Sequence, residues 1–291
     1  MDYTLYIGDY AYSSWSMRGW LLFDAFGIDT GIRVVDFHAG EVRDHLAALA
    51  PARTVPTLIT PEGAIVSESL AIAEELATRH PKAGHWPSDA KARAIARTIT
   101  SEMHAGFGAL RTACPMALRI AYQGVRPDAD VVADLRRLEV IWGNARSETG
   151  AKGPWLCGDY SAADAFYAPI AARIAGYGLK VSASAQIYVD AHLNNPSFRR
   201  WRAMGLVKGA TLKRYDRNHD TTEWPGPQPL AAKAVKAGPA ENQTCPYSGR
   251  PVTDFLEIDD RRFGFCNAFC RDKTVADPQA WPAFMKLYAP I

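Results

Sequence analysis

The spacing of apolar and polar residues changes along the chain and divides it into three parts. In the first 81 residues, short runs of β type alternate with stretches of helical periodicity. A Pro-Glu-Gly turn at 61–63 separates two of these runs, as in a hairpin. The expected strands and helices, in the order βαβαββα, are 4–7, 17–26, 32–37, 41–49, 55–59, 64–66 and 69–78. The pattern predicts an α/β domain over residues 1–81, with a loop at 8–14 after the first strand.

From residue 88 onward the periodicity is helical, and no convincing strand appears. Pro115 should end or kink one helix, because proline removes a backbone donor. The expected helices are 90–107, 128–147, 162–175 and 185–194. This second part is predicted to be all-α and to run over 88–224. The βαβαββα order of the first part is that of the thioredoxin-like fold, so we expect a thioredoxin-like α/β domain followed by a helical domain.

The third part is short and contains most of the cysteines. It follows a predicted linker, 225–243, whose first 18 residues hold four prolines and two glycines without apolar periodicity. In the module that follows, 244–288, residues 255–265 have the pattern of a hairpin with Asp259 and Asp260 in its turn. We therefore expect a small zinc-ribbon or treble-clef-like extension.

Composition narrows the classes of protein to which the chain can belong. Apolar residues make up 48 %, enough for a sizeable core, and 33 basic residues nearly balance 31 acidic ones. That balance gives no reason to expect a nucleic acid or an anionic membrane as partner. No secretory signal or membrane span is expected, and the five scattered cysteines indicate a reducing compartment, so a cytoplasmic protein is predicted.

A serine cluster, Ser13, Ser14 and Ser16, lies where the first helix should begin. A helix N-terminus favours a bound anion, and a serine hydroxyl there can donate to a thiolate. A free thiol with a pKa near 8.5 is only about 3 % ionised at pH 7, and lowering that pKa by two units takes roughly 2.7 kcal/mol. The alternative is that these serines only cap the helix.

Two further segments suggest a ligand of amino-acid or peptide type. Pro56 opens a strand, and a cis bond after Val55 is one way to accommodate it. The Val55 backbone would then face a cleft. Glu68 and Ser69 stand between a strand and a helix, where Glu68 can take an ammonium and Ser69 a carboxylate.

These segments together resemble the glutathione-site motifs of the glutathione transferase family. The motifs are Tyr-Ser-Ser-Trp-Ser-Met-Arg at 12–18, Thr-Val-Pro-Thr-Leu at 54–58 and Glu-Ser-Leu-Ala-Ile at 68–72. Ser161 and Asp164, before an apolar helix, resemble the family's N-capping box, which is structural. The resemblance covers about residues 3 to 215 and is greatest to the serine-type, zeta-like members.

The resemblance implies a role for each matching residue. Ser13 would hold the glutathione thiolate, with Ser14 as its neighbour. The residues expected to bind the rest of glutathione are Arg53, Thr54, Val55, Pro56, Glu68 and Ser69. Zeta members have cysteine where this chain has Trp15, so maleylacetoacetate isomerase activity is the less favoured form of the prediction. The resemblance also implies a homodimer.

The acceptor pocket should lie between the loop after the first strand and the first long helix of the α domain. Its candidate residues are Tyr10, Trp15, His104, Phe107 and Arg111. The last three would share one helical face at spacings of three and four. For His104, packing within the core remains the alternative.

The C-terminal module presents Cys245, Cys266 and Cys270 as candidate metal ligands. The last two are four apart, so on a helix they would share a face and could bind one ion, with zinc preferred for thiolates. The module resembles the YHS and TRASH treble-clef type. It has Ser248 where such modules often have a further cysteine, so a metal-free relic is the alternative.

The sequence thus predicts a glutathione transferase that adds glutathione to an electrophilic small molecule or assists an isomerisation. Glutathione would be the co-substrate, and zinc a candidate structural metal. The rival prediction is a non-enzymatic regulatory or chaperone protein that binds glutathione or metal.

Overall fold

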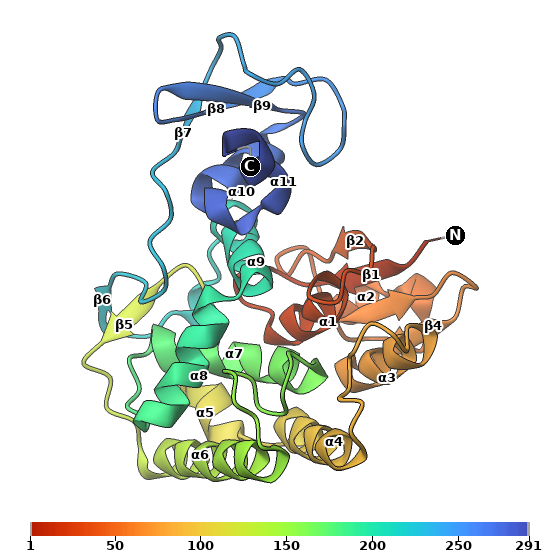
Figure 1. Cartoon of the computed structure of the whole chain (residues 1–291), viewed down its shortest axis with the longest axis vertical. Helices are drawn as coiled ribbons and strands as arrows, with labels where there is room; N and C mark the ends of the chain where they lie inside the picture. Colours follow the sequence, from red (N-terminus) through yellow and green to blue (C-terminus); the bar gives the residue numbers. More distant parts are fainter. Residues whose placement is uncertain (1, 290–291) are drawn as a thin grey trace.

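A four-stranded sheet forms the centre of the N-terminal domain (Figure 1). The computed structural model describes residues 2–289 and orders the strands β2-β1-β3-β4, with β2 parallel to β1 and the others antiparallel. The elements are β1 (Thr4–Ile7), α1 (Ser14–Asp24), β2 (Gly31–Val34), α2 (Val42–His45), a 3₁₀ turn (Ala47–Leu49), β3 (Thr57–Ile59), β4 (Ile65–Ser67) and α3 (Ser69–Arg79). The predicted thioredoxin-like order is confirmed.

The alternation of side chains along β1 explains why helices cover both faces of this sheet. Leu5 and Ile7 are 0 % exposed and belong to the core shared with α1 and α3. Tyr6 points to the opposite face, where it packs with a smaller cluster that includes Leu46 and Leu49. A strand places successive side chains on opposite faces, so one short apolar strand supports both layers.

Helix α1 begins earlier than its apolar periodicity indicates. The predicted start was residue 17, whereas the helix starts at Ser14 with Ser13 as its N-cap. The side chain of Ser13 accepts a hydrogen bond from the backbone of Ser16 and so satisfies one of the unpaired N–H groups of the first turn. The serine cluster therefore belongs to the first turn of the helix.

The second domain is a helical bundle built around α7, which is buried along almost its whole length. Its elements are α4 (Ala90–Ala105), α5 (Gly108–Ala113), β5 (Ala121–Gln123), α6 (Ala129–Thr149), α7 (Ala162–Gly176), α8 (Ala183–Asn194), α9 (Pro196–Val207), a 3₁₀ turn (Lys213–Tyr215) and β6 (Asp220–Thr222). The short β5–β6 ladder was not expected from the sequence. Nor was α9, although Asn195 caps it and Pro196 occupies its first position.

The first long helix of this domain is shorter than predicted. It ends at Ala105, and Phe107 adopts a left-handed backbone conformation with φ of 60° before α5 begins. Gly106 and Gly108 flank Phe107, and glycine is a poor helix former, so the chain breaks here. His104, Phe107 and Arg111 consequently do not share one helical face, which corrects that prediction.

The C-terminal module is a three-stranded sheet packed on two helices. Its elements are β7 (Lys233–Val235), β8 (Asp254–Ile258), β9 (Arg261–Phe265), α10 (Ala268–Ala276), a 3₁₀ turn (Pro278–Ala280) and α11 (Pro282–Tyr288). The hairpin turns through Asp259 and Asp260, both with positive φ, as the sequence predicted. β7 pairs with β8, so the predicted linker 225–243 contributes a strand to the module.

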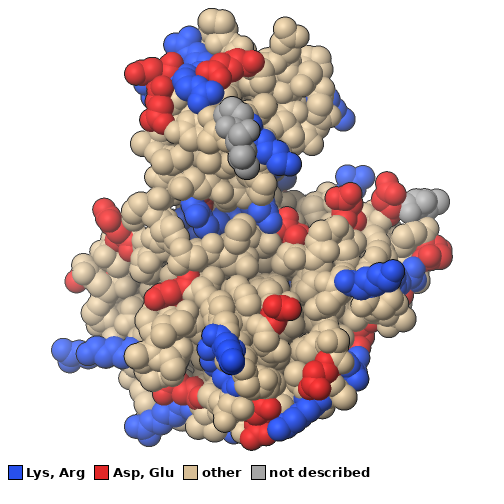
Figure 2. All heavy atoms as spheres, in the orientation of Figure 1, with Lys and Arg blue, Asp and Glu red and all other residues tan. Residues whose placement is uncertain are grey.

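The module sits on α9, away from the bundle's other helices (Figure 1). Arg199 of α9 donates two hydrogen bonds to the Asp277 carboxylate, at 2.8 and 2.7 Å, and both side chains are largely buried. On the face drawn in Figure 2, acidic and basic side chains are interspersed. Across residues 2–289, no helix has both the length and the apolar character needed to cross a membrane.

Candidate functional site

A cleft of about 660 Å³ opens at the start of α1, between the N-terminal domain and the helical bundle. Its walls come from the loop before α1, the segment before β3, helix α5 and the last turn of α7. The predicted site residues that line it are Ser13, Ser14, Trp15, Arg53, Thr54, Val55 and Arg111. Both predicted catalytic serines and the segment before Pro56 therefore share one cleft.

The two serines occupy the first positions of α1 but have different partners. Ser13 Oγ accepts from the Ser16 backbone N–H at 3.3 Å and donates to Ser16 Oγ at 2.7 Å. Ser14 Oγ accepts from Nη2 of Arg173 at 3.3 Å. Helix capping, the alternative raised from the sequence, is thus part of what Ser13 does, whereas Ser14 has another contact. An anion bound here would meet the positive end of the helix dipole.

Three arginines surround this helix start, and none forms an ion pair with a carboxylate of the described residues. Arg173 reaches in from α7, and the Arg111 guanidinium lies over the Trp15 ring, 4.6 Å from its centroid. Arg18 is 0 % exposed, and none of its guanidinium nitrogens has a hydrogen-bond partner within residues 2–289. Burial lowers the pKa of each, to about 10 for Arg173, and the neighbouring arginines lower it further at Arg18 and Arg173. Positive charge in a poorly solvated place favours a bound anion.

The segment before β3 offers unpaired backbone groups to the cleft. The Val55–Pro56 peptide bond is cis, as the sequence suggested. β3 starts only at Thr57, and among the described residues no hydrogen bond joins the Val55 backbone to another group. Its N–H and carbonyl can therefore pair with the backbone of a peptide-like ligand. Arg53 and Thr54 are exposed at the edge of the same cleft.

Glu68 and Ser69 lie beside the cleft, at the start of α3, and are not part of its lining. Glu68 has a φ of 71°, which is uncommon for a residue with a side chain, and it makes no side-chain cap bond. The Ser69 hydroxyl is buried without a partner in the described part of the chain. Both features suit a position that receives polar groups from a ligand. The Glu68 carboxylate lies 3.6 Å from Nε2 of His104.

The residues predicted for the acceptor pocket separate into two groups. Trp15 and Arg111 line the cleft. Tyr10 lies instead in the core, 4 % exposed and packed on Trp201, and burial raises the pKa of its hydroxyl to about 12. His104 makes an edge-to-face contact with the Trp15 ring and does not line the cleft, and Phe107 is buried at the break between α4 and α5. The loop after β1 turns inward at Tyr10, which corrects the prediction that Tyr10 lines the acceptor pocket.

Several lining residues were missed by sequence reasoning: Tyr12, Phe37, Val42, Thr112, Pro115, Met116, Arg173 and Tyr215. Half of them come from loops, whose positions the periodicity of the sequence does not predict. Arg173 did leave a signal, because it is one of two charged residues inside the apolar stretch of α7. A buried arginine needs partners, and one partner of Arg173, Ser14, lines the cleft.

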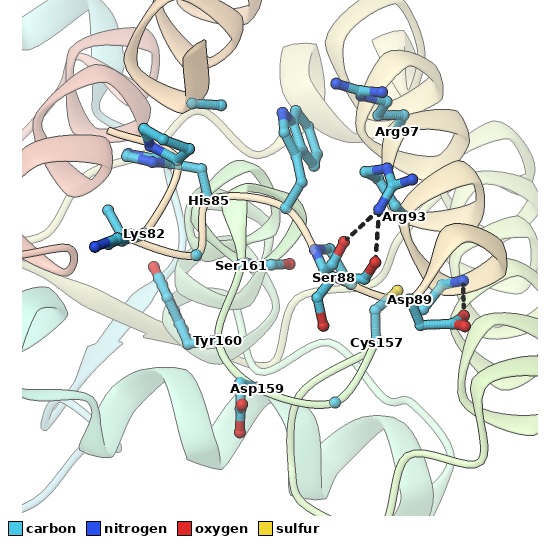
Figure 3. Close-up of a pocket in the computed structure, with 18 of the residues that line it drawn as sticks. Lys82, His85, Ser88, Asp89, Arg93, Arg97, Cys157, Asp159, Tyr160 and Ser161 are labelled. Carbon is cyan, nitrogen blue, oxygen red and sulfur yellow. Dashed lines mark hydrogen bonds between the residues drawn. The ribbon is translucent and has the colours of Figure 1, made fainter. Parts of the chain in front are cut away.

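A larger cleft, of about 770 Å³, lies elsewhere, between the segment after α3, the start of α4 and the loop before α7 (Figure 3). Several of its polar groups are engaged within the protein: Arg93 donates to the carbonyls of Pro87 and Ser88, and Asp89 caps α4. Burial raises the pKa of the Cys157 thiol to about 12, so it is a poor nucleophile. None of the predicted site residues lines this cleft.

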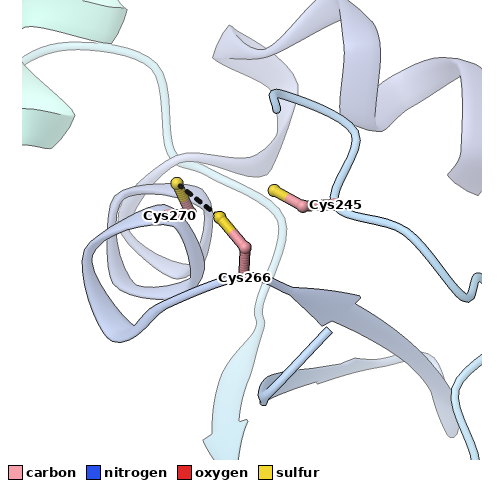
Figure 4. A group of neighbouring side chains, drawn as sticks. All are labelled: Cys245, Cys266 and Cys270. Carbon is pink, nitrogen blue, oxygen red and sulfur yellow. Dashed lines mark hydrogen bonds between the residues drawn. The ribbon is translucent and has the colours of Figure 1, made fainter. Parts of the chain in front are cut away.

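The three cysteines of the C-terminal module converge (Figure 4). Their sulfur atoms all lie within 4.8 Å of one another, and those of Cys266 and Cys270 are 4.0 Å apart. Cys266 precedes α10, so the pair does not share a helical face as predicted, and Asn267 caps the helix between them. Ser248 Oγ donates to the sulfur of Cys266 at 3.1 Å, which places a hydroxyl at the edge of the cluster.

The surroundings favour negative charge on Cys245, whereas burial raises the pKa of the Cys270 thiol to about 12. Burial raises the pKa of Cys245, but hydrogen bonds from the backbones of Cys266 and Tyr247 outweigh it and bring that pKa to about 7. The ammonium of Lys273 lies among aromatic rings, 4.0 Å from the Trp281 ring centroid and 4.2 Å from that of Tyr247, and its charge acts on all three cysteines. Three thiolates within this spacing match the donor set of a zinc site in type and in approximate distance.

Comparison with known proteins agrees with the motifs. Residues 12–79 match the family described as "Glutathione S-transferase, N-terminal domain". A "Probable maleylacetoacetate isomerase" of Caenorhabditis elegans is 30 % identical over 132 residues, which are 44 % of this chain and 60 % of that protein. The chain thus matches less than two thirds of the length of this curated relative.

Solved structures extend the likeness to the helical domain. A glutathione transferase homologue from Burkholderia with bound glutathione has a TM-score of 0.52 at 24 % identity, over 69 % of this chain and 96 % of that one. Omega 1C from Trametes versicolor, also a glutathione transferase, has a TM-score of 0.53 at 18 % identity, over 69 % and 90 % of the two chains. The resemblance to the glutathione transferase family and the predicted fold are thereby confirmed.

Proposed function

Because the chain resembles the glutathione transferases in fold and in motifs, we propose that it is an enzyme of this kind, which activates the thiol of glutathione with a serine hydroxyl at the start of α1. The observation that carries the proposal is the cleft itself. Ser13, Ser14 and the unpaired Val55 backbone meet there with the three arginines that line the cleft, Arg53, Arg111 and Arg173. No aspartate or glutamate lines the described cleft. Such a place stabilises a thiolate more than a thiol.

The proposed chemistry needs a modest stabilisation. A serine hydroxyl that donates to the sulfur, the N-terminus of α1 and the charge of Arg173 each favour the thiolate over the thiol. Lowering the thiol pKa by two units requires about 2.7 kcal/mol, which these effects can supply together. The thiol proton passes to solvent, and the thiolate forms a carbon–sulfur bond to an electrophilic carbon. At that carbon either a π bond opens and the resulting anion takes a proton from solvent, or the bond to a leaving group breaks and the group departs with the electron pair.

Binding of the tripeptide is assigned to the two segments that flank the cleft. The Val55 backbone would pair with the cysteinyl part of glutathione, and Arg53 or Thr54 would meet the glycyl carboxylate. Glu68 and the buried hydroxyl of Ser69 would hold the γ-glutamyl head group. A cysteine nucleophile for thiol exchange is not available, because the chain has no cysteine before Cys114.

The acceptor is proposed to be a small electrophile that contacts Trp15 and Arg111. Isomerase activity, suggested by the name of the Caenorhabditis elegans relative, is the second form of the proposal. Turnover of a panel of electrophiles, including a maleylacetoacetate analogue, with glutathione would test both. Absence of turnover with every member, despite measurable glutathione binding, would contradict the enzymatic proposal and favour a binding protein.

The cysteine cluster supports a second component of the proposal, a zinc ion held by Cys245, Cys266 and Cys270. The ion would cross-link the turn at Cys245 to the start of α10, with Lys273 balancing the excess negative charge of three thiolates. Its role would be structural, and the same observation keeps a metal-binding regulatory protein as the rival function. The homodimer and the cytoplasmic location expected from the sequence remain predictions.

A further inference from the structure

The two serines at the start of α1 differ in whether their hydroxyl proton is free. Ser13 gives its proton to Ser16 Oγ at 2.7 Å, and Ser16 Oγ also accepts from the backbone N–H of Gly8 at 2.8 Å. Ser13 would have to break this short bond before it could donate to a ligand. Its hydroxyl therefore belongs to the hydrogen bonds that join the first turn of α1 to the end of β1.

Ser14 has the opposite arrangement. Its Oγ accepts one hydrogen bond, from Arg173 Nη2 at 3.3 Å, and donates none to the described residues. Ser14 lines the cleft, so its proton can be given to an acceptor that enters there. With one lone pair occupied by a guanidinium, the hydroxyl is also polarised toward donation.

Arg173 is fixed in this position by the helical domain. Its Nε donates to the carbonyl of Cys114 at 2.9 Å, and Nη1 donates to the carbonyl of Pro169 at 3.1 Å. The side chain is only 4 % exposed, and its other hydrogen-bond acceptors are neutral. A guanidinium held by neutral acceptors keeps its full positive charge beside the cleft, whereas one paired with a carboxylate would not.

We propose that Ser14, and not Ser13, donates the hydrogen bond to the glutathione thiolate, and that Arg173 is the positioning residue that orients this hydroxyl and favours the thiolate by its charge. The inference rests on the proposed function, because it names the groups that would act on the same thiol. A purely structural role of Arg173, joining α7 to the segment at 114–115, is the competing explanation.

The experiment measures the pH midpoint of thiolate formation in bound glutathione, from ultraviolet absorbance, together with the pH profile of kcat/KM. Ser14→Ala should raise the midpoint by about one to two pH units and lower kcat/KM about 10- to 100-fold at neutral pH, because the thiolate loses a charge-assisted bond. Arg173→Lys should raise the midpoint by less than Arg173→Met. Ser13→Ala should destabilise α1 as a lost cap but leave the midpoint at its wild-type value.

Arg202 is the control, because it is a partly buried arginine that also donates to a backbone carbonyl, at Leu118, and it lies outside the cleft. Arg202→Met should cost stability without moving the midpoint.

A midpoint raised by Ser13→Ala and unmoved by Ser14→Ala would overturn the inference. So would Arg173 variants that lose stability as Arg202→Met does but keep the wild-type midpoint. If Arg173 variants fail to fold, the two serine variants still decide. Wild-type protein that binds no glutathione would instead contradict the proposed function itself.

Discussion

Single buried side chains give the site its chemical character. Arg18, Arg111 and Arg173 are held against aromatic rings and carbonyls, so their charges are not neutralised before a ligand arrives. Glu68 is the acidic residue at the edge of this positive region, and its backbone has a positive φ. An anionic sulfur and a cationic ammonium of one ligand would therefore find opposite charges a short distance apart.

Glu68→Gln tests the ammonium contact at this scale. The amide keeps the size of the side chain but removes its charge, so we expect glutathione to bind more weakly, with KM raised roughly 10-fold for one lost charge-assisted bond. The KM of the electrophile should change little. Glu74→Gln is the control, since Glu74 pairs with Arg97 on the outer surface of α3. Calorimetry that finds wild-type glutathione affinity in Glu68→Gln would refute this assignment.

Buried His192 makes the stability of the folded protein depend on pH. It is 0 % exposed, neither ring nitrogen has a partner in the described residues, and burial lowers the pKa of the imidazole from 6.5 to about 3. The folded protein thus keeps His192 neutral while the unfolded chain binds a proton below pH 6.5, so stability is present above that pH and is lost as the pH falls toward 3.

At pH 5 the difference in proton binding at His192 amounts to about 2 kcal/mol of unfolding free energy. His192→Phe, which keeps a ring against Trp155 and Tyr188, should remove that part of the acid sensitivity. Urea unfolding at pH 7 and pH 5 measures it: the wild type should lose more stability between the two values than the variant. Equal losses would mean that His192 is protonated in the folded state.

At the scale of elements, α9 packs directly against the loop that leads to the serines. A Cβ added at Gly205 would lie 3.2 Å from the backbone nitrogen of Ala11, so α9 rests directly on the loop that leads to Ser13. Trp201, one turn earlier, packs against Tyr10 in the same loop and against Trp20 of α1. The position of the serines therefore depends on α9, which is the last helix of the helical domain in the sequence.

Two helical glycines provide a direct test of this packing. Gly143 in α6 is exposed with open space around it, so Gly143→Ala should stabilise the protein by up to about 1 kcal/mol through helix propensity. Gly205→Ala gains the same propensity but crowds backbone that cannot move aside cheaply, which costs about 1–3 kcal/mol. Thermal unfolding should place the Gly205→Ala midpoint below that of Gly143→Ala. A Gly205→Ala protein as stable as Gly143→Ala would show that the loop adapts.

The sequence predicted the elements with strong periodicity and missed those that depend on distant contacts. Helix α7 and the hairpin of the module came out within a residue or two, because apolar periodicity and turn residues specify them locally. Tyr10 was misplaced because its inward position depends on a tertiary contact, with Trp201 of α9, that the local sequence does not show. Arg173 was visible as a charge in an apolar helix, yet its contact with Ser14, 159 positions away in the chain, is a property of the tertiary fold.

At the scale of the whole molecule, α9 joins the cysteine module to the domain that carries the serines. Arg199 holds Asp277 of the module, while Arg200 donates both to the Ala280 carbonyl and to Asp24 at the end of α1. These arginines are 16 % and 15 % exposed in their side chains, so solvent screens the contacts only in part. The module is thus docked on the core rather than tethered loosely to it.

The proposed zinc ion predicts which part of the molecule depends on metal. Protein purified without added metal should carry close to one zinc per chain, Cys266→Ser should lose it, and Cys157→Ala, which removes a buried thiol of the helical domain, should keep it. Ser248→Cys should bind zinc more tightly, because it offers a fourth thiolate beside Cys266.

Since metal binding contributes directly to the folding of small modules, chelation of the full chain should raise hydrogen exchange in residues 244–288. The main core of the bundle and the sheet should stay protected, and glutathione should still bind, because every residue assigned to that site lies outside the module. Metal-free protein with the module fully protected would rule out the zinc site, and loss of glutathione binding on chelation would show that the docked module is part of the active unit.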